Sequence, residues 1–111
     1  MKDDAVHLKQ ILECIGRIEE DIAEGEQRFM SSHTLQDAVL RNLQTMAEST
    51  QRLSDAAKQS HPEVEWRRIA TFRNVLVYGY LGVDLVAVWD IVQRDIPELK
   101  RVIEVMLKTN G

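Results

Sequence analysis

Cysteine is almost absent from this chain, since Cys14 is the only one among 111 residues. A single thiol cannot form a disulfide within the chain. The opening residues Met1-Lys2-Asp3-Asp4 also lack the basic region followed by an apolar one that marks a secretion signal. We therefore expect a cytoplasmic protein.

Long apolar runs are lacking as well. The most apolar stretch, Val75 to Trp89, has only 15 residues and carries Asp84 inside it. A membrane-spanning helix needs about 20 mostly apolar residues. No membrane partner is expected, and a buried or interfacial helix explains the stretch better.

Positive charge is scarce over most of the sequence. The formal net charge is −4, and residues 1–30 hold eight acidic against four basic side chains. In residues 63–80, by contrast, three arginines outnumber two glutamates. The overall charge argues against a protein that reads nucleic-acid sequence, which would normally have a broad basic face. Any phosphate-binding surface must therefore be local.

No group of His, Cys or carboxylate residues has the spacing of metal ligands. The three histidines, His7, His33 and His61, are scattered along the chain. We therefore expect neither a metal ion nor another cofactor. Because there is also no internal repeat, low-complexity tract or long linker, residues 1–111 should form a single domain.

The spacing of apolar residues predicts helices in the first half of the chain. Steps of three and four residues indicate one helix at 4–24 and a second at 35–59. The residues between them, 25–33, should form a loop, and Thr34 with Asp37 has the spacing of a capping box for the second helix. The two apolar stripes consist of Leu8, Ile11, Leu12, Ile15, Ile18 and Ile22, and of Leu35, Val39, Leu43, Met46, Thr50, Leu53 and Ala57.

Helices are also predicted in the second half. A third helix begins near Val64, and two glycines indicate a turn around Tyr78 to Leu81. A nearly all-round apolar helix follows at Val83–Asp95, and Pro97 should break or kink the chain before a last helical stretch. The sequence thus predicts an all-α fold, an up-and-down bundle of four to five helices. A bundle this small cannot cover every apolar face, so we expect a homodimer.

The segment Arg73 to Tyr80 places polar groups inside the most apolar part of the sequence. An unpaired buried polar group costs roughly 1 to 3 kcal/mol, so these groups must either be satisfied structurally or line a site. At about 100° per residue, Arg73 and Tyr80 lie within roughly 20° of each other on a helix, and Asn74 and Tyr78 within about 40°. Two interpretations remain open at this point: a structural role, with capped carbonyls or a carboxylate partner, and a functional site.

Other candidate residues receive structural interpretations. Glu48 and Asp84 are the expected buried carboxylates, and either can brace the arginine of this segment. Cys14 lies among isoleucines and should be a buried, inert thiol. Trp66 and Trp89 have helical spacing and are expected in the core or at an interface.

The polar segment reads Arg73, Asn74, three residues, Tyr78, Gly79, Tyr80. It resembles the motif of the HepT-like branch of the HEPN family, in which an arginine, usually followed by asparagine, and four residues precede His-x-Tyr. Only the histidine differs, since Tyr78 stands in its place. The similarity extends over nearly the whole chain, through Phe29, the run Gln36–Leu43, Ala47-Glu48, Pro62 and Trp66.

Members of this family are homodimeric, metal-independent endoribonucleases, the toxins of type VII-like toxin–antitoxin pairs. The resemblance implies that two copies of the motif form a composite site at the dimer interface, where RNA is cleaved. Arg73 would hold the scissile phosphate, and Asn74 would orient neighbouring groups. The family histidine would be the general acid or base. Tyr78, with a reference pKa of about 10, cannot accept a proton in this way at pH 7, so weak or lost activity is expected.

The resemblance also implies a protein partner and a modification. In the family, the cognate minimal nucleotidyltransferase antitoxin transfers AMP from ATP to the motif tyrosine, which is Tyr80 here. Tyr80 follows the family pattern, so this adenylylation is expected even where Tyr78 removes catalysis. Two other interpretations stay open: a non-catalytic helical binding module that docks the nucleotidyltransferase, and a purely structural helical dimer.

Overall fold

The computed structural model describes residues 2–78 and 84–110, with side chains for 4–72 and 84–109. Within these ranges every regular element is a helix, and no strand is present. The predicted all-α class is therefore confirmed. The helices are α1 (Lys2–Asp21), α2 (Glu26–Ser31), α3 (His33–Gln51), α4 (Asp55–Gln59), α5 (Trp66–Tyr78) and α6 (Leu85–Asn110).

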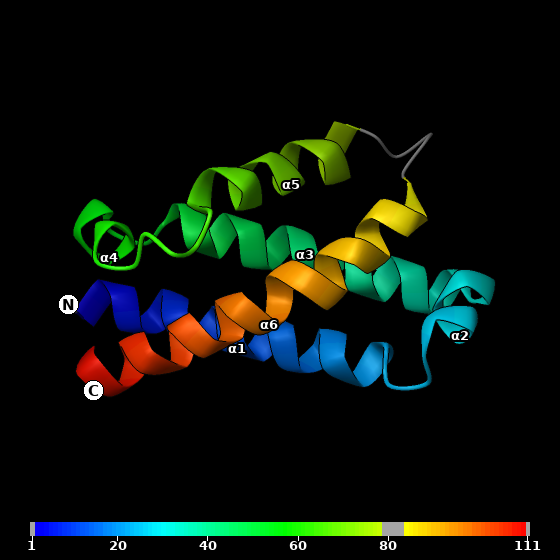
Figure 1. The fold of residues 1–111 in the computed structure, drawn as a ribbon, viewed down its shortest axis with the longest axis horizontal. Coiled ribbons are helices and arrows are strands. Elements are labelled where there is room, and N and C mark those ends of the chain that lie inside the picture. The colour runs from blue at the N-terminus through cyan, green and yellow to red at the C-terminus, as the bar shows by residue number, and fades with distance from the viewer. Residues whose placement is uncertain (1, 79–83, 111) are drawn as a thin grey trace.

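The four long helices form a bundle in which successive long helices run in opposite directions (Figure 1). Helix α1 packs against α3 and α6, and α3 also packs against α5. The short helices α2 and α4 lie at the two ends of α3, and both chain termini lie at the α4 end (Figure 1). This arrangement agrees with the predicted up-and-down bundle. None of the described helices is long and apolar enough to cross a lipid bilayer.

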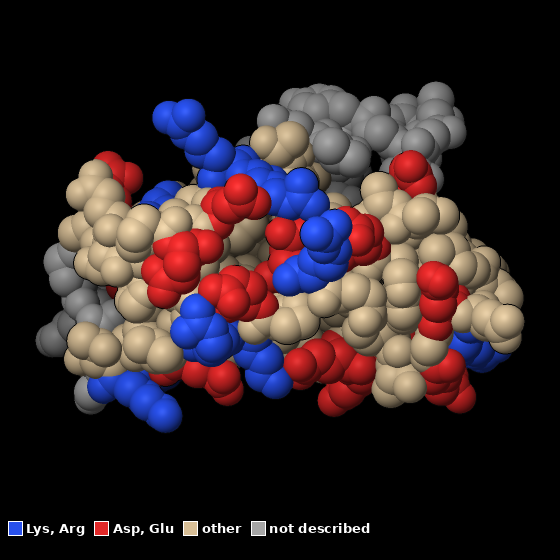
Figure 2. Space-filling view, in the orientation of Figure 1, with Lys and Arg blue, Asp and Glu red and all other residues tan. Residues whose placement is uncertain are grey.

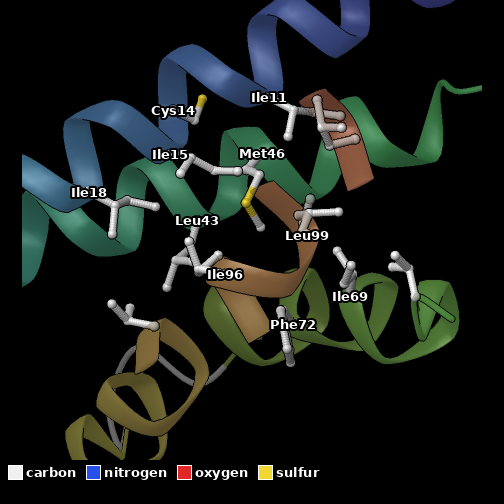
Figure 3. Close-up of a cluster of buried hydrophobic side chains, with 14 of the residues drawn as sticks. Ile11, Cys14, Ile15, Ile18, Leu43, Met46, Ile69, Phe72, Ile96 and Leu99 are labelled. Carbon is white, nitrogen blue, oxygen red and sulfur yellow. The ribbon is translucent and has the colours of Figure 1, made fainter. Parts of the chain in front are cut away.

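One apolar core joins the long helices. In the first predicted stripe, Leu8, Ile11, Ile15 and Ile18 are fully inaccessible to solvent, and Leu12 and Ile22 are partly buried against the core. Ile11, Ile15 and Ile18 on α1 face Leu43 and Met46 on α3 (Figure 3). The core continues through Val64, which precedes α5, and then into α5 and α6 through Ile69, Phe72, Val88, Val92, Ile96, Leu99, Val102, Ile103 and Met106.

The loop predicted at 25–33 contains the short helix α2, which is a correction to the sequence interpretation. Gly25 precedes this helix with φ = 97°, a backbone conformation that other residues rarely adopt. Phe29 is fully buried, and its carbonyl accepts a hydrogen bond of 2.9 Å from the Gln36 side-chain amide. A single buried residue therefore anchors α2, and six residues are too few to produce a periodic pattern.

The extent predicted for the second helix, 35–59, is wrong, because the helix is interrupted between α3 and α4. The Asp4 carboxylate on α1 accepts hydrogen bonds from the Ser54 backbone N–H at 2.9 Å and from the Ser54 hydroxyl at 2.8 Å. Ser54 then caps α4 by accepting from the Ala57 N–H at 3.1 Å. Asp4 and Ser54 are 50 residues apart in sequence, and the hydrogen bonds between them take the place of helical hydrogen bonds at this interruption.

Two predicted helix ends are also corrected. The N-cap of α3 is Ser32, whose hydroxyl accepts from the Leu35 N–H at 3.2 Å, and not Thr34. Helix α5 begins at Trp66, two residues after the predicted start.

Pro97 does not end a helix, because α6 is continuous from Leu85 to Asn110. Proline removes one hydrogen-bond donor and leaves the carbonyl four residues earlier, at Gln93, without its usual partner. Gln93 and Pro97 are both exposed, so water can bind this carbonyl. The buried residues on the opposite side, Val92, Ile96 and Leu99, keep the helix in register.

Candidate functional site

Helix α5 carries the first three residues of the motif, and its start is fixed by Trp66. The half-buried indole donates to the carbonyls of Lys58 and His61, each at 3.0 Å. These hydrogen bonds attach the first turn of α5 to the end of α4. Trp66 and Trp89 were expected in the core or at an interface, and both are partly buried against the core, with the Trp89 ring 5.4 Å from that of Phe29.

One face of α5 is buried against the bundle. Ile69 and Phe72 are 3% and 5% exposed, and they point into the core towards Ile96 and Leu99 of α6 (Figure 3). Helix α5 also packs along α3. The helix that bears the motif therefore has a fixed rotation about its axis.

An ion pair joins α5 to α6. The Arg68 guanidinium donates to both carboxylate oxygens of Asp95, at 3.0 and 3.1 Å, and lies 5.4 Å from the centre of the Phe72 ring. These hydrogen bonds raise the pKa of Arg68, and nearby carboxylates add to the effect. Two parallel N–H···O bonds restrict both distance and orientation, so the pair fixes the spacing between the two helices.

The motif residues Arg73, Asn74 and Tyr78 all belong to the helical backbone of α5, which ends at Tyr78. At about 100° per residue, Tyr78 lies one turn beyond Asn74 on nearly the same side of the helix. Their side chains are outside the described part of the chain. Tyr80 and the turn predicted near it also lie outside the described residues, so the roles of these four residues stay predictions.

A groove of about 420 Å³ lies between the first half of α5 and the start of α6. Phe72, Val88 and Ile91 provide apolar lining, and Arg68, Asp84 and Asp90 provide charged groups. Asp84 is exposed, and its carboxylate caps α6 by accepting from the N–H groups of Val86 and Ala87 at 3.0 and 3.2 Å. The prediction that Asp84 is buried is therefore wrong, because helix capping accounts for this carboxylate.

Glu48, the other expected buried carboxylate, is half-buried on α3. The buried carboxylate among the described residues is Asp4, which is 4% exposed and was not singled out from the sequence. Burial tends to raise the pKa of Asp4, but its two hydrogen bonds from Ser54 outweigh this effect and hold the pKa below its ordinary value. The position of Asp4 could have indicated its burial, since Asp4 precedes Leu8 by four residues and so lies on the buried stripe of α1.

The remaining candidate groups among the described residues are the Cys14 thiol and the side chains that could bind a metal ion. Cys14 is buried as expected, and burial raises the pKa of its thiol, which disfavours the reactive thiolate. Across residues 4–72 and 84–109, no group of three or more His, Cys, Asp or Glu side chains is placed to hold a metal ion.

Known proteins with similar sequences include several that are described as probable or putative ribonucleases. The family model described as "Ribonuclease HepT-like" matches residues 11–106. The "Probable ribonuclease HepT" of Thermococcus cleftensis is 36% identical over 103 residues, which cover 92% of this chain and 94% of that protein. A "Putative RNase" of Caldanaerobacter subterraneus is 29% identical over 109 residues, which cover 97% of each chain.

A further relative is considerably longer than this chain. The "Gamma-glutamylcyclotransferase and putative RNase" of Methanocaldococcus jannaschii is 37% identical over 100 residues. The match covers 89% of this chain and 45% of that protein, so the chain spans less than half of it. No solved structure gives a significant match.

Proposed function

Because this chain belongs to the HepT-like ribonuclease family, we propose that it is an endoribonuclease-type toxin of a type VII-like toxin–antitoxin pair, with RNA as its substrate. The observation that carries the proposal is the position of Arg73 and Asn74 on α5, a helix that lies within the matched residues 11–106. Helix α5 is held by its buried face and by the Arg68–Asp95 pair, which suits a helix that must present reacting groups accurately.

The proposed reaction needs no metal ion, because RNA supplies its own nucleophile. A base removes the proton from a ribose 2′-hydroxyl, whose oxygen then forms a bond to the adjacent phosphorus. The bond from phosphorus to the 5′-oxygen breaks, and this oxygen takes up a proton as it leaves. Arg73 stabilises the charge that accumulates on the phosphate oxygens, and Asn74 orients neighbouring groups.

Tyr78 limits this reaction. At pH 7 a tyrosine with a reference pKa of about 10 keeps its proton, so it can donate a hydrogen bond but cannot act as the base. The loss of a positioned acid or base typically lowers the rate by a factor of about 10² to 10⁴. We therefore propose that the chain is a weak or inactive form of the enzyme.

The active unit is proposed to be a homodimer with a composite site. Val86 is 70% exposed at the start of α6, and the adjacent Ala87 is exposed and lines the apolar groove beside α5. Apolar side chains gathered in this way favour a protein contact. A second copy bound here would bring two α5 helices together, and with them two copies of Arg73 and Asn74.

A second candidate function is a non-catalytic module that docks a minimal nucleotidyltransferase. The observation that favours it is Tyr78 at the position of the family histidine. Such a module would keep the bundle and Tyr80 and would bind its partner without cleaving RNA.

Restoring the histidine separates these two functions. The Tyr78→His chain should cleave RNA at least a hundredfold faster than the unaltered chain, in the presence or absence of a chelator. Adding Arg73→Ala should abolish the cleavage without loss of helical circular dichroism. A Tyr78→His protein that is folded and dimeric but leaves RNA intact would rule out the ribonuclease and favour the docking module.

A further inference from the structure

Half of the described basic side chains on this acidic protein are paired with carboxylates. Of the six that have no such pair, two lie close to the start of α5. Across the side chains at 4–72 and 84–109, neither Lys58 nor Arg67 has a carboxylate partner within 4.0 Å, and Arg67 is exposed. The paired basic residues are Arg17, Arg28, Arg68, Arg94, Lys100 and Arg101.

Lys58 and Arg67 share one open groove of about 920 Å³ between α4 and α5. The Trp66 indole, held by the carbonyls of Lys58 and His61, forms part of its wall. The charge of Arg68 is taken up by Asp95, so Lys58 and Arg67 supply the available positive charge. The charged and aromatic residues that line the groove are Asp55, Lys58, Glu65, Trp66, Arg67 and Arg68.

Acidic residues limit the directions from which a phosphate chain can approach. A second hollow on the α6 side is lined by Glu63, Glu65, Asp95 and Glu98, with Arg94 as its basic residue. In Figure 2, basic side chains cover the first half of α5, and acidic side chains crowd the surface next to it. The hollow has four carboxylates and one arginine, whereas the groove has three basic residues and two carboxylates. A polyanion is therefore repelled more strongly from the hollow, and the more favourable approach is over Lys58 and Arg67.

Helix geometry connects this groove to the motif. Arg67 and Asn74 are seven residues apart on α5, so they lie within about 20° of each other around the helix and about 10 Å apart along it. A strand that passes over Arg67 can therefore continue along the same side of α5 to the motif. Thr71, between them, is also exposed, so no bulky side chain at that position blocks the path.

We propose that Lys58 and Arg67 form a phosphate-binding subsite that holds single-stranded RNA beside the scissile phosphate. The subsite rests on the proposed ribonuclease function, since the motif defines where the strand must lead. It supplies affinity without reading bases, because the contacts are to phosphates. Single-stranded RNA suits it better than a duplex, because the favourable approach is a narrow strip beside an acidic surface.

The salt dependence of binding tests the subsite directly. The probe is a fluorescein-labelled oligouridine, and its affinity is measured by anisotropy over a series of salt concentrations. Each phosphate contact on a single strand contributes about 0.7 to the slope of log K against log salt. The double variant Lys58→Gln/Arg67→Gln should therefore have a slope smaller by about 1.4.

A matched control removes the same charge elsewhere. Lys9 and Lys108 are exposed on α1 and α6, and neither lines the groove. The double variant Lys9→Gln/Lys108→Gln has the same net charge as the first and should keep the original slope. Equal salt-dependence slopes for the two double variants would overturn the subsite and would favour a protein partner as the occupant of the groove.

Cleavage distinguishes failure of the subsite from failure of the proposed function. In the Tyr78→His background, Lys58→Gln/Arg67→Gln should raise KM for a long oligouridine and leave KM for a dinucleotide and both kcat values unchanged. If RNA is cleaved but the slopes are equal, the subsite is wrong and the ribonuclease stands. If RNA is not cleaved but the slopes differ as expected, the surface binds RNA and the ribonuclease assignment is wrong.

Discussion

Arg68 on α5 and Asp95 on α6 form a two-point ion pair with N···O distances of 3.0 and 3.1 Å. The guanidinium side chain is 45% exposed, so solvent screens much of the attraction. Its contribution to stability should be modest, but its geometry determines how far the motif helix stands from α6. The contribution to stability can be measured separately from the effect on the distance between the helices.

Double-mutant cycles should measure the strength of this pair. Arg68→Ala, Asp95→Ala and the double variant, unfolded in urea, should give a coupling of about 0.5 to 1 kcal/mol, the upper range for exposed pairs with good geometry. The same cycle on Arg94 and Asp90, which are 3.7 Å apart within one helix, should give a smaller value. A coupling no larger than that control would mean that the pair does not hold α5 against α6.

Acid should weaken the link between Asp4 and Ser54. The folded state holds the pKa of Asp4 below its ordinary value, so the hydrogen-bonded carboxylate stabilises the fold fully above the unfolded pKa. This contribution begins to fall below about pH 5 and is lost as the pH drops through the folded pKa. At pH 7, Asp4→Asn should lower the free energy of unfolding by about 1 to 2 kcal/mol.

Urea unfolding of both proteins between pH 7 and pH 3 checks this sign. The stability difference between the unaltered chain and Asp4→Asn should shrink as the pH falls. Asp55→Asn, at an exposed carboxylate next to Ser54, provides the control and should give a nearly constant difference. A gap that widens on acidification would contradict a lowered pKa.

The Asp4–Ser54 contact also explains what could be read from the sequence. Periodicity predicted the α1 stripe from Leu8 to Ile18 correctly, because burial on a helix follows a local repeat. The break at Arg52–Ser54 could not be predicted in this way, since apolar spacing continues through Leu53 and the break depends on Asp4. At Pro97 a local rule predicted a break or a kink, and the break did not occur, because buried neighbours on α6 maintained the helix.

The candidate site was predictable only in part. The residue order around Arg73 predicted a motif, and the backbone of α5 places Arg73, Asn74 and Tyr78 on one helix. The surrounding groups were not foreseen: Asp84 caps α6, and Asp95 holds Arg68. The Asp84 cap is local, because it joins residues two and three apart in sequence, so N-cap spacing could have indicated it. The Arg68–Asp95 contact joins residues 27 apart, and it depends on how α5 and α6 lie side by side, which no pattern along the chain encodes.

Dimerisation should depend on Val86. Light scattering should give twice the 12.8 kDa mass of the chain, and Val86→Asp should shift it to the monomer, because a carboxylate buried in an apolar contact costs several kcal/mol. Val105→Asp is the matched control, since Val105 is also exposed on α6 but lies far from α5. If both variants remain dimeric, the composite site does not form at this face.

Adenylylation should occur on Tyr80 when the chain meets its proposed antitoxin, a minimal nucleotidyltransferase. In this reaction the tyrosine oxygen attacks the α-phosphorus of ATP, forms a phosphodiester bond and releases pyrophosphate. The new anionic group would lie seven residues beyond Arg73, where it can pair with the guanidinium and repel an RNA phosphate. The modification would therefore block the substrate by charge and by bulk.

Mass spectrometry after incubation with the antitoxin, ATP and Mg²⁺ should detect at least one added AMP, and fragmentation should place it on Tyr80. Tyr80→Phe should prevent this addition, and Tyr78→Phe, the matched control two residues away, should not. In the Tyr78→His background, prior modification should also remove RNA cleavage and lower the affinity for oligouridine. An AMP that is added to Tyr80→Phe as readily as to the unaltered chain would exclude Tyr80 as the acceptor, and control of the enzyme would then depend on another residue.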